Sequence, residues 1–340
     1  MCMYRIPPSC QQQPRQRRAA TNRYDVQGLA CPRKKHPQVY ASERKRVNVT
    51  RGNGSAPKAK PVTGKPKLGQ HFLRDEAAVI RIVEALGDIS QSTVLEIGPG
   101  PGTLTGLLAK RSGRLIAIEL DRVLAAQLSM AYALAPNVEV LQADILSIDF
   151  DTLFAPRPGT IRPGIQRVQE KARVVGNLPY YITSDILLHL FAFERYFDRV
   201  VIMVQREVAD RLVAKPGGSE YGLLSATAQL YARVEKLFEL PPTAFSPPPK
   251  VHSAVIRLTM EPKTAELGVP ASEMIAFFKL AFAQKRKTLG NNLKARYTDA
   301  ELKAALGEAN IKASVRAEAL SLEKMAVLAR ALLAAGPRVS

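Results

Sequence analysis

A glycine-rich turn follows a short apolar run at residues 94–103, which read VLEIGPGPGT. Glycine lets the backbone approach a ligand closely and adopt positive φ, and such turns bind ligands at the carboxyl ends of parallel strands. The spacing is G-x-G-x-G, so Thr103 stands where the dinucleotide fingerprint requires a third glycine. The turn therefore favours a ligand without a pyrophosphate, such as S-adenosylmethionine, contacted by Gly98 and Gly100.

Two acidic residues follow the next two apolar runs. Glu119 is the last residue of the run 114–119 and lies 21 residues after Gly98. An acid in that position can accept both hydroxyls of a ribose. Asp144 follows residues 138–142, where a carboxylate suits the exocyclic amine of an adenine. For Asp144 the alternative is a cap on a helix or turn.

The tetrapeptide Asn177-Leu178-Pro179-Tyr180 could act on an exocyclic amine, whose lone pair is delocalised into the ring. The Asn177 amide oxygen and the Leu178 carbonyl could accept its two N–H groups and stabilise developing positive charge, while Pro179 restricts the backbone. Tyr180 offers a face for an extruded base. In isolation an ordinary turn is the alternative. Together with the glycine turn and the two acids, the tetrapeptide favours methyl transfer from a sulfonium, which needs no strong general base.

Two later segments could contact RNA. The proline loop at residues 245–251 could place Phe245 against the base and Lys250 near a phosphate, although it could equally be a rigid connection between strands. Lys285, Arg286 and Lys287 follow a predicted helix and could contact an RNA backbone. Their alternative is the solvated, charged end of that helix.

The elements that must position these residues alternate from about residue 62 onward, as in a parallel α/β sheet. The predicted strands are 93–97, 114–119, 138–142, 173–176, 199–204, 233–239 and 253–259. The predicted helices include 104–110, 122–131, 185–193, 207–212, 271–284, 299–309 and 321–334. We predict a loop insertion at residues 151–171 and a linker at residues 261–270. The linker places a domain boundary near residue 265.

The charge of this 340-residue chain indicates a polyanionic partner. Lys and Arg total 49 against 30 Asp and Glu, a net charge of +19. The first 60 residues hold 14 of the cations and 2 of the anions. We interpret residues 1–61 as a disordered basic arm, with a transit peptide or a start codon assigned too far upstream as alternatives. All three cysteines lie in this arm, so no disulfide and no metal site is expected in the body. No apolar run approaches the length of a membrane span.

Taken in order, these motifs resemble those of the ribosomal RNA adenine N6,N6-dimethyltransferase family. The resemblance covers about residues 64–335 and includes three further segments, KLGQHFL at 67–73, VQREVA at 204–209 and YGLLS at 221–225. It implies an α/β fold, with a Rossmann-like class I methyltransferase domain at residues 62–264. A small α-helical, RNA-binding domain would follow at residues 265–340.

The resemblance also implies roles for single residues. His71 and Leu73 would close over S-adenosylmethionine, and Gly98 would face its methionine part. The remaining implied contacts are Glu119 with the ribose, Asp144 with the adenine, Asn177 with cofactor and target amine, and Tyr180 with the target base. The implied substrate is a pair of adjacent adenosines near the 3′ end of small-subunit rRNA, each receiving two methyl groups, with the immature small subunit as partner.

Other functions remain open from the sequence. A related large-subunit adenine methyltransferase of the antibiotic-resistance type shares the catalytic motifs, but the proline loop followed by the basic segment favours the small-subunit type. A mainly non-catalytic assembly factor would bind the same RNA. We expect a cytoplasmic monomer without membrane contact, or a mitochondrial or plastid protein if the arm is a transit peptide.

Overall fold

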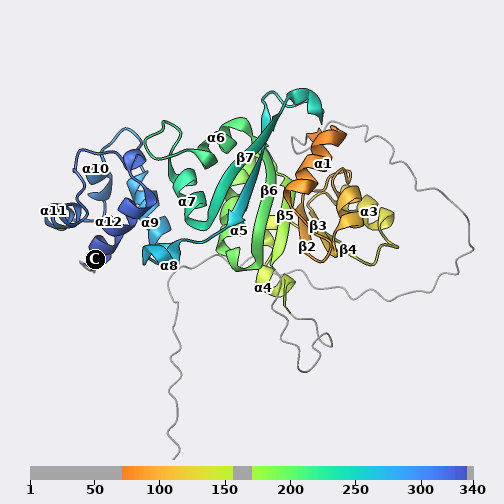
Figure 1. Cartoon of the computed structure of the whole chain (residues 1–340), viewed down its shortest axis with the longest axis horizontal. Helices are drawn as coiled ribbons and strands as arrows, with labels where there is room; N and C mark the ends of the chain where they lie inside the picture. Colours follow the sequence, from red (N-terminus) through yellow and green to blue (C-terminus); the bar gives the residue numbers. More distant parts are fainter. Residues whose placement is uncertain (1–70, 156–170, 335–340) are drawn as a thin grey trace, which may run out of the picture. The chain divides into compact units, whose positions relative to one another are not determined.

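A computed structural model describes residues 71–155 and 171–334, so the basic arm and most of the predicted insertion lie outside the described residues. Within them, seven strands form one sheet in the order β4-β3-β2-β5-β6-β9-β7 (Figure 1). These strands are β2 (Thr93–Ile97), β3 (Arg114–Glu119), β4 (Val138–Gln142), β5 (Ala172–Asn177), β6 (Phe197–Gln205), β7 (Ala232–Leu240) and β9 (Ser253–Met260). A separate pair joins β1 (Phe72–Leu73) to β8 (Phe245–Ser246).

The strand order reverses at the boundary between β2 and β5. From β2 the chain proceeds outward to β3 and β4, whereas β6 lies on the other side of β5, and all of these neighbours are parallel. Near their carboxyl ends, Ile97 of β2 pairs with Gly176 of β5. A reversal of this kind leaves a crevice beyond the strand ends. The glycine turn after β2 and the tetrapeptide at the end of β5 therefore meet at one place.

One edge of the sheet corrects the expectation of a parallel sheet. β9 pairs antiparallel with β6, and β7 pairs antiparallel with β9. A parallel pair needs a long crossover, usually an α-helix, whereas residues 241–252 between β7 and β9 contain only a 3₁₀ turn, the short strand β8 and the proline loop. The antiparallel edge follows from that connection.

Helices cover both faces of the sheet, because neighbouring strand residues point to opposite faces. Val94 and Val175 pack in one buried cluster with the apolar side of α1, whereas Leu95 and Val174 pack in the other with α5 and α7. The α-helices are α1 (Glu76–Ala85), α2 (Thr105–Arg111), α3 (Arg122–Ala131), α4 (Phe150–Leu153), α5 (Thr183–Ala192), α6 (Arg206–Val213), α7 (Leu223–Tyr231), α8 (Thr264–Leu267), α9 (Ala271–Ala281), α10 (Leu289–Leu293), α11 (Asp299–Glu308) and α12 (Leu322–Ala334).

The C-terminal helices share the core of the sheet layer. Met274 and Phe278 of α9 belong to the same buried cluster as Leu230 of α7. The segment at 261–270, predicted as a linker, contains α8, and its Leu267 is buried in that cluster too. Of the helices described, none is long and apolar enough to cross a membrane.

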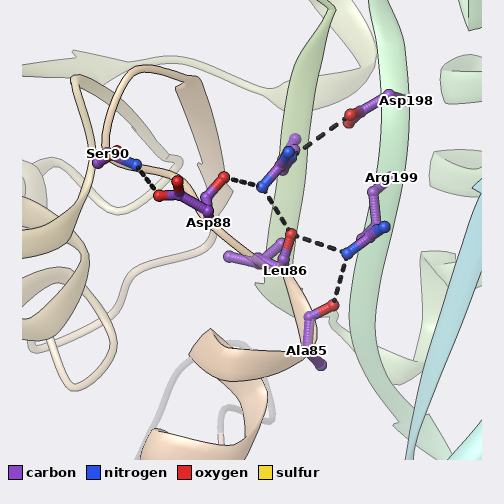
Figure 2. Close-up of polar contacts among 7 residues, drawn as sticks. Ala85, Leu86, Asp88, Ser90, Asp198 and Arg199 are labelled. Atoms are coloured by element: carbon purple, nitrogen blue, oxygen red, sulfur yellow. Dashed lines mark hydrogen bonds and ion pairs between the residues drawn. The ribbon is translucent and has the colours of Figure 1, made fainter.

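Two arginines hold the C-terminal end of α1 against the starts of β5 and β6 (Figure 2). Arg173 Nη1 donates to the Leu86 carbonyl at 2.8 Å and also to the Asp88 carbonyl. Arg199 Nη1 donates to the same Leu86 carbonyl at 3.0 Å. Carbonyl groups at a helix C-terminus lack partners within the helix, so cationic donors there stabilise the helix end.

Candidate active site

Most residues predicted to do chemistry line one cavity at the carboxyl edge of the parallel strands. The cavity lies beyond the ends of β2, β3 and β5, beside the segment at 71–72. The predicted residues that line it are His71, Gly98, Gly100, Glu119, Asp144, Asn177, Leu178, Pro179 and Tyr180. The strand reversal thus brings together side chains that lie up to 109 positions apart in the sequence.

The glycine turn needs glycine for its conformation and for the space beside it. Gly98 and Gly100 have φ of +64° and +58°. A Cβ on Gly100 would lie 2.8 Å from the ring of Phe72. The Gly98 N–H donates to the Ile118 carbonyl at 2.9 Å, which ties the start of the turn to β3. Backbone therefore forms this wall of the cavity.

The two acids are each held by backbone N–H groups. Glu119 is 3% exposed, and its Oε2 accepts from the Gly100 N–H at 2.9 Å while Oε1 accepts from the Asp121 N–H at 2.8 Å. Asp144 Oδ1 accepts from the Leu146 N–H at 3.0 Å and caps a 3₁₀ turn. Asp144 thus caps the turn, as the alternative interpretation expected, and it also lines the cavity, while its contact with an adenine stays a prediction.

Asn177 ends β5 and joins the cavity wall to the segment before α1. Its Nδ2 donates to the His71 carbonyl at 2.7 Å. The next residue, Leu178, is buried and donates its N–H to the Met203 carbonyl at 3.1 Å. The Asn177 amide thus donates through Nδ2 to His71, and its Oδ1 is the atom that can accept a hydrogen bond from a ligand.

Tyr180 presents a partly buried ring to the cavity. Its hydroxyl forms a 2.7 Å hydrogen bond with Ser253 Oγ at the start of β9. The His71 ring stacks on it, with 5.9 Å between ring centroids and 25° between planes. Burial raises the pKa of Tyr180 despite the opposing effect of the Ser253 hydrogen bond, so the phenol is protonated at neutral pH.

Two predicted residues lie behind the cavity wall instead. Leu73 and Phe245 pair in the two-stranded β1–β8 ladder, with exposures of 4% each, and pack in a buried cluster. Neither lines the cavity. Both side chains are buried in the described structure, and the contact of Phe245 with a base that the sequence suggested stays a prediction.

None of the predicted cations lines this cavity. Lys250 is exposed in the proline loop, and Lys285, Arg286 and Lys287 are exposed after α9. Lys285 Nζ donates to the Ser219 carbonyl at 2.7 Å. Lys285 and Lys287 line a second cavity, between α5, α7 and α9.

Glu96 is a buried acid to which the sequence interpretation gave no role. It is fully enclosed in β2 behind the glycine turn, and its Oε2 accepts from Thr105 Oγ1 at 2.7 Å. Its Oε1 has no hydrogen-bond partner among the described residues. Desolvation is the main cause that raises the pKa of Glu96 to about 8, and nearby Glu119 adds to it. An acid inside the apolar strand was the only sequence signal.

The fold and the cavity together define a class of protein. A parallel sheet with a strand reversal, a glycine turn and two strand-end acids is the arrangement of α/β proteins that bind an adenosine-containing cofactor. Among the described residues, no group of three or more His, Cys, Asp or Glu side chains is arranged to hold a metal ion.

Comparison with known proteins narrows this class. The family model for ribosomal RNA adenine dimethylase matches residues 62–333. The chain is 57% identical over 264 residues to "Ribosomal RNA small subunit methyltransferase A" of Koribacter versatilis, covering 78% of this chain and 93% of the relative. It is 56% identical over 269 residues to the protein of that name from Acidobacterium capsulatum, covering 79% and 91%. This chain therefore belongs to the ribosomal RNA adenine dimethylase family.

Solved structures agree on the fold. The 23S rRNA methyltransferase ErmE superposes with a TM-score of 0.56 at 26% identity, covering 77% of this chain and 99% of that one. A dimethyladenosine transferase from Plasmodium falciparum gives a TM-score of 0.59 at 23% identity, covering 76% and 96%. Both comparisons support the Rossmann-like α/β fold with a helical part that the sequence implied.

Proposed function

We propose that this chain transfers methyl groups from S-adenosylmethionine to N6 of two adjacent adenosines near the 3′ end of small-subunit rRNA, two to each. The observation that carries the proposal is the position of Asn177, in one cavity with Gly98, Gly100 and Glu119. An amide acceptor beside a cofactor-type turn suits the activation of an exocyclic amine. Membership of the adenine dimethylase family and the names of the most similar relatives support the choice of substrate.

The residues present fit the proposed cofactor. The glycine turn presents backbone to the cavity through Gly98 and Gly100, both at positive φ. The Glu119 carboxylate is fixed in orientation by two N–H donors, and its remaining lone pairs can accept the hydroxyls of a ribose. Asp144 would accept the adenine amine, and His71 would cover the cavity. When bound, S-adenosylmethionine supplies an electrophilic methyl group on a sulfonium.

The tetrapeptide would hold the target base. Asn177 Oδ1 and the Leu178 carbonyl accept the two N–H groups of the amine and favour its nucleophilic, pyramidal form. Tyr180, held by Ser253, presents its ring to the base. Pro179 sets the direction of the backbone between them. These groups stabilise the positive charge that develops on the amine, and a strong base is not required.

RNA contacts would come from the cations outside the cavity. We propose that Lys250, Lys285, Arg286 and Lys287 bind phosphates, with residues 265–340 acting as the RNA-binding part and residues 62–264 as the methyltransferase part. The partner would be the immature small subunit, engaged by a monomer in the cytoplasm. A transit peptide within residues 1–61 would instead direct the chain to a mitochondrion or plastid.

A large-subunit substrate is the second candidate, because a 23S rRNA methyltransferase is among the structures that share this fold. The higher identity to the small-subunit relatives favours the first. A mainly non-catalytic assembly role would need neither Asn177 nor Glu119 in the cavity, and their placement favours catalysis.

The Asn177→Ala variant tests the mechanism. The reaction is measured as methyl transfer to small subunits that lack the modification, alongside circular dichroism and calorimetric binding of S-adenosylmethionine. We expect the rate to fall by about 10²–10³-fold with the fold retained, which is the typical effect of losing one such polar group. Gln127→Ala, an exposed amide on α3, is the matched control and should retain full activity. Full activity in Asn177→Ala would contradict the proposal.

A further inference from the structure

The second cavity has the size of a small-ligand site. It lies between α5, α7 and α9 and has a volume of about 450 Å³. That volume is within the range of known ligand pockets. We call it the α5–α7–α9 cavity. No residue that lines it is used by the methyl-transfer mechanism.

Its walls include exposed apolar surface suited to a flat ring. Leu188 of α5 and Leu223 of α7 line the cavity with exposures of 40% and 39%. Phe282, just after α9, also lines it and meets the buried Tyr221 edge-on, with centroids 6.0 Å apart. Large apolar side chains left exposed around a hollow mark a binding surface.

The charges around the cavity favour an anionic ligand. Lys279, Lys285 and Lys287 line it. Its two acids are each within 4 Å of an arginine, at 3.8 Å for Glu220 with Arg211 and 3.7 Å for Glu318 with Arg316.

Two of these lysines have side-chain ammonium groups that are available to bind a ligand. Within the part of the chain that the structure describes, the side-chain ammonium groups of Lys279 and Lys287 form no ion pair and no hydrogen bond. The cavity therefore combines an apolar wall with ammonium groups that can face phosphates, which is the combination expected for a nucleotide.

The 3₁₀ turn before α5 and one face of α5 connect this cavity to the candidate active site. Tyr181 is 63% exposed and lines the first cavity, whereas Ser184 and Leu188 line the second. Tyr181 lies in the 3₁₀ turn Tyr180–Ile182 directly before α5, and Ser184 and Leu188, four residues apart, lie on one face of α5. Tyr181 lies three residues before Ser184, and α5 rises about 6 Å from Ser184 to Leu188, a span that one RNA strand can cover.

We propose that the α5–α7–α9 cavity receives the base of a nucleotide that flanks the target adenosine on the same RNA strand. Leu188, Leu223 and Phe282 pack on that base, and Lys279 and Lys287 bind the adjoining phosphates. The inference rests on the proposed function, because the target adenosine at Tyr180 determines which strand passes along α5. It adds a second contact that would select the sequence beside the target.

Photo-crosslinking tests this placement. Leu223 is replaced by p-azidophenylalanine in the full chain, which is incubated with immature small subunits and irradiated, and crosslinked nucleotides are mapped by reverse-transcriptase stops. We expect a stop within a few nucleotides of the adenosine pair, at least about fivefold above the signal from Val123 replaced in the same way. Val123 is 64% exposed on α3 and lines neither cavity.

A second variant checks the contribution of the cavity to affinity. Leu223→Glu places a negative charge beside the proposed phosphates, and we expect it to weaken binding to the immature subunit about tenfold, whereas Val123→Glu should not. Methyl transfer by the wild type is measured on the same particles. Transfer without a crosslink near the target, or a crosslink only to a ribosomal protein, would overturn the cavity assignment alone. No transfer by the wild type would overturn the proposed function as well.

Discussion

Backbone groups position the two most informative side chains of the candidate site. Glu119 accepts N–H groups of Gly100 and Asp121, and Asn177 donates to the His71 carbonyl. Donors and acceptors that are fixed before the ligand arrives cost no reorganisation during the reaction. The spacing after each strand located Glu119 and Asn177 in the sequence. It could not supply the His71 contact, because that partner lies 106 residues away and no local pattern connects them.

Glu96 is expected to make stability depend on pH. Its pKa of about 8 in the folded chain lies above the ordinary value of 4.5, so the folded state binds the proton more tightly than the unfolded state. Its contribution to stability is therefore complete below pH 4.5 and is lost as the pH rises through about 8. Glu96→Gln keeps the shape and removes the ionisation.

Denaturant unfolding at pH 6 and pH 8.5 measures this effect. At pH 8.5 we expect Glu96→Gln to be more stable than the wild type by on the order of 1 kcal/mol or more, with a smaller difference at pH 6. Glu139→Gln, at a partly exposed ion pair with Arg114, is the control and should show no such rise in relative stability. An equal difference at both pH values would contradict a raised pKa at Glu96.

At the scale of elements, the apolar runs located the strands well: a buried strand such as β3 needs a continuous apolar run, whereas the edge strand β4 includes Glu139 and has no buried residue. Residues 114–119 and 138–142 are strands with the predicted bounds. The pairing direction of β9 was not predictable from its composition, since direction depends on the connection and on the neighbouring strand. Phe245 illustrates the same difficulty. The two-residue strands β1 and β8 have no period to detect, and their pairing buries the ring.

The contacts of Arg173 and Arg199 with the C-terminal end of α1, here called the clamp, give a prediction about stability. Arg199→Ala removes a donor from the carbonyls of Ala85 and Leu86, and those groups lose a charged partner. We expect a loss of about 1–3 kcal/mol in the free energy of unfolding. Arg195→Ala is the matched control, because Arg195 is half exposed and pairs with the half-exposed Asp151, an ion pair of little net value. Chemical denaturation measures both, and equal losses would contradict a specific role for the clamp.

At the scale of the whole molecule, one buried cluster runs from the sheet into the C-terminal helices. It includes Leu95 of β2, Leu230 of α7 and Phe278 of α9. The composition of the sequence changes near residue 265. A sequence pattern describes one segment at a time, however, so it could not predict that the segments on both sides of that point pack together. The functional division into a methyltransferase part and an RNA-binding part therefore stays a prediction, tested by the RNA contacts of each.

The chemistry and the substrate are tested together by one measurement. Small and large ribosomal subunits that lack the modification are each incubated with the full chain and S-adenosylmethionine, and primer extension is run across the 3′ end of the small-subunit rRNA and across 23S rRNA. N6,N6-dimethylation blocks Watson–Crick pairing and stops reverse transcriptase. We expect paired stops at two adjacent adenosines of the small-subunit rRNA, and we expect the Asn177→Ala variant to lack them. Stops only in 23S rRNA, or no stop in either RNA with the cofactor bound, would contradict the proposed function.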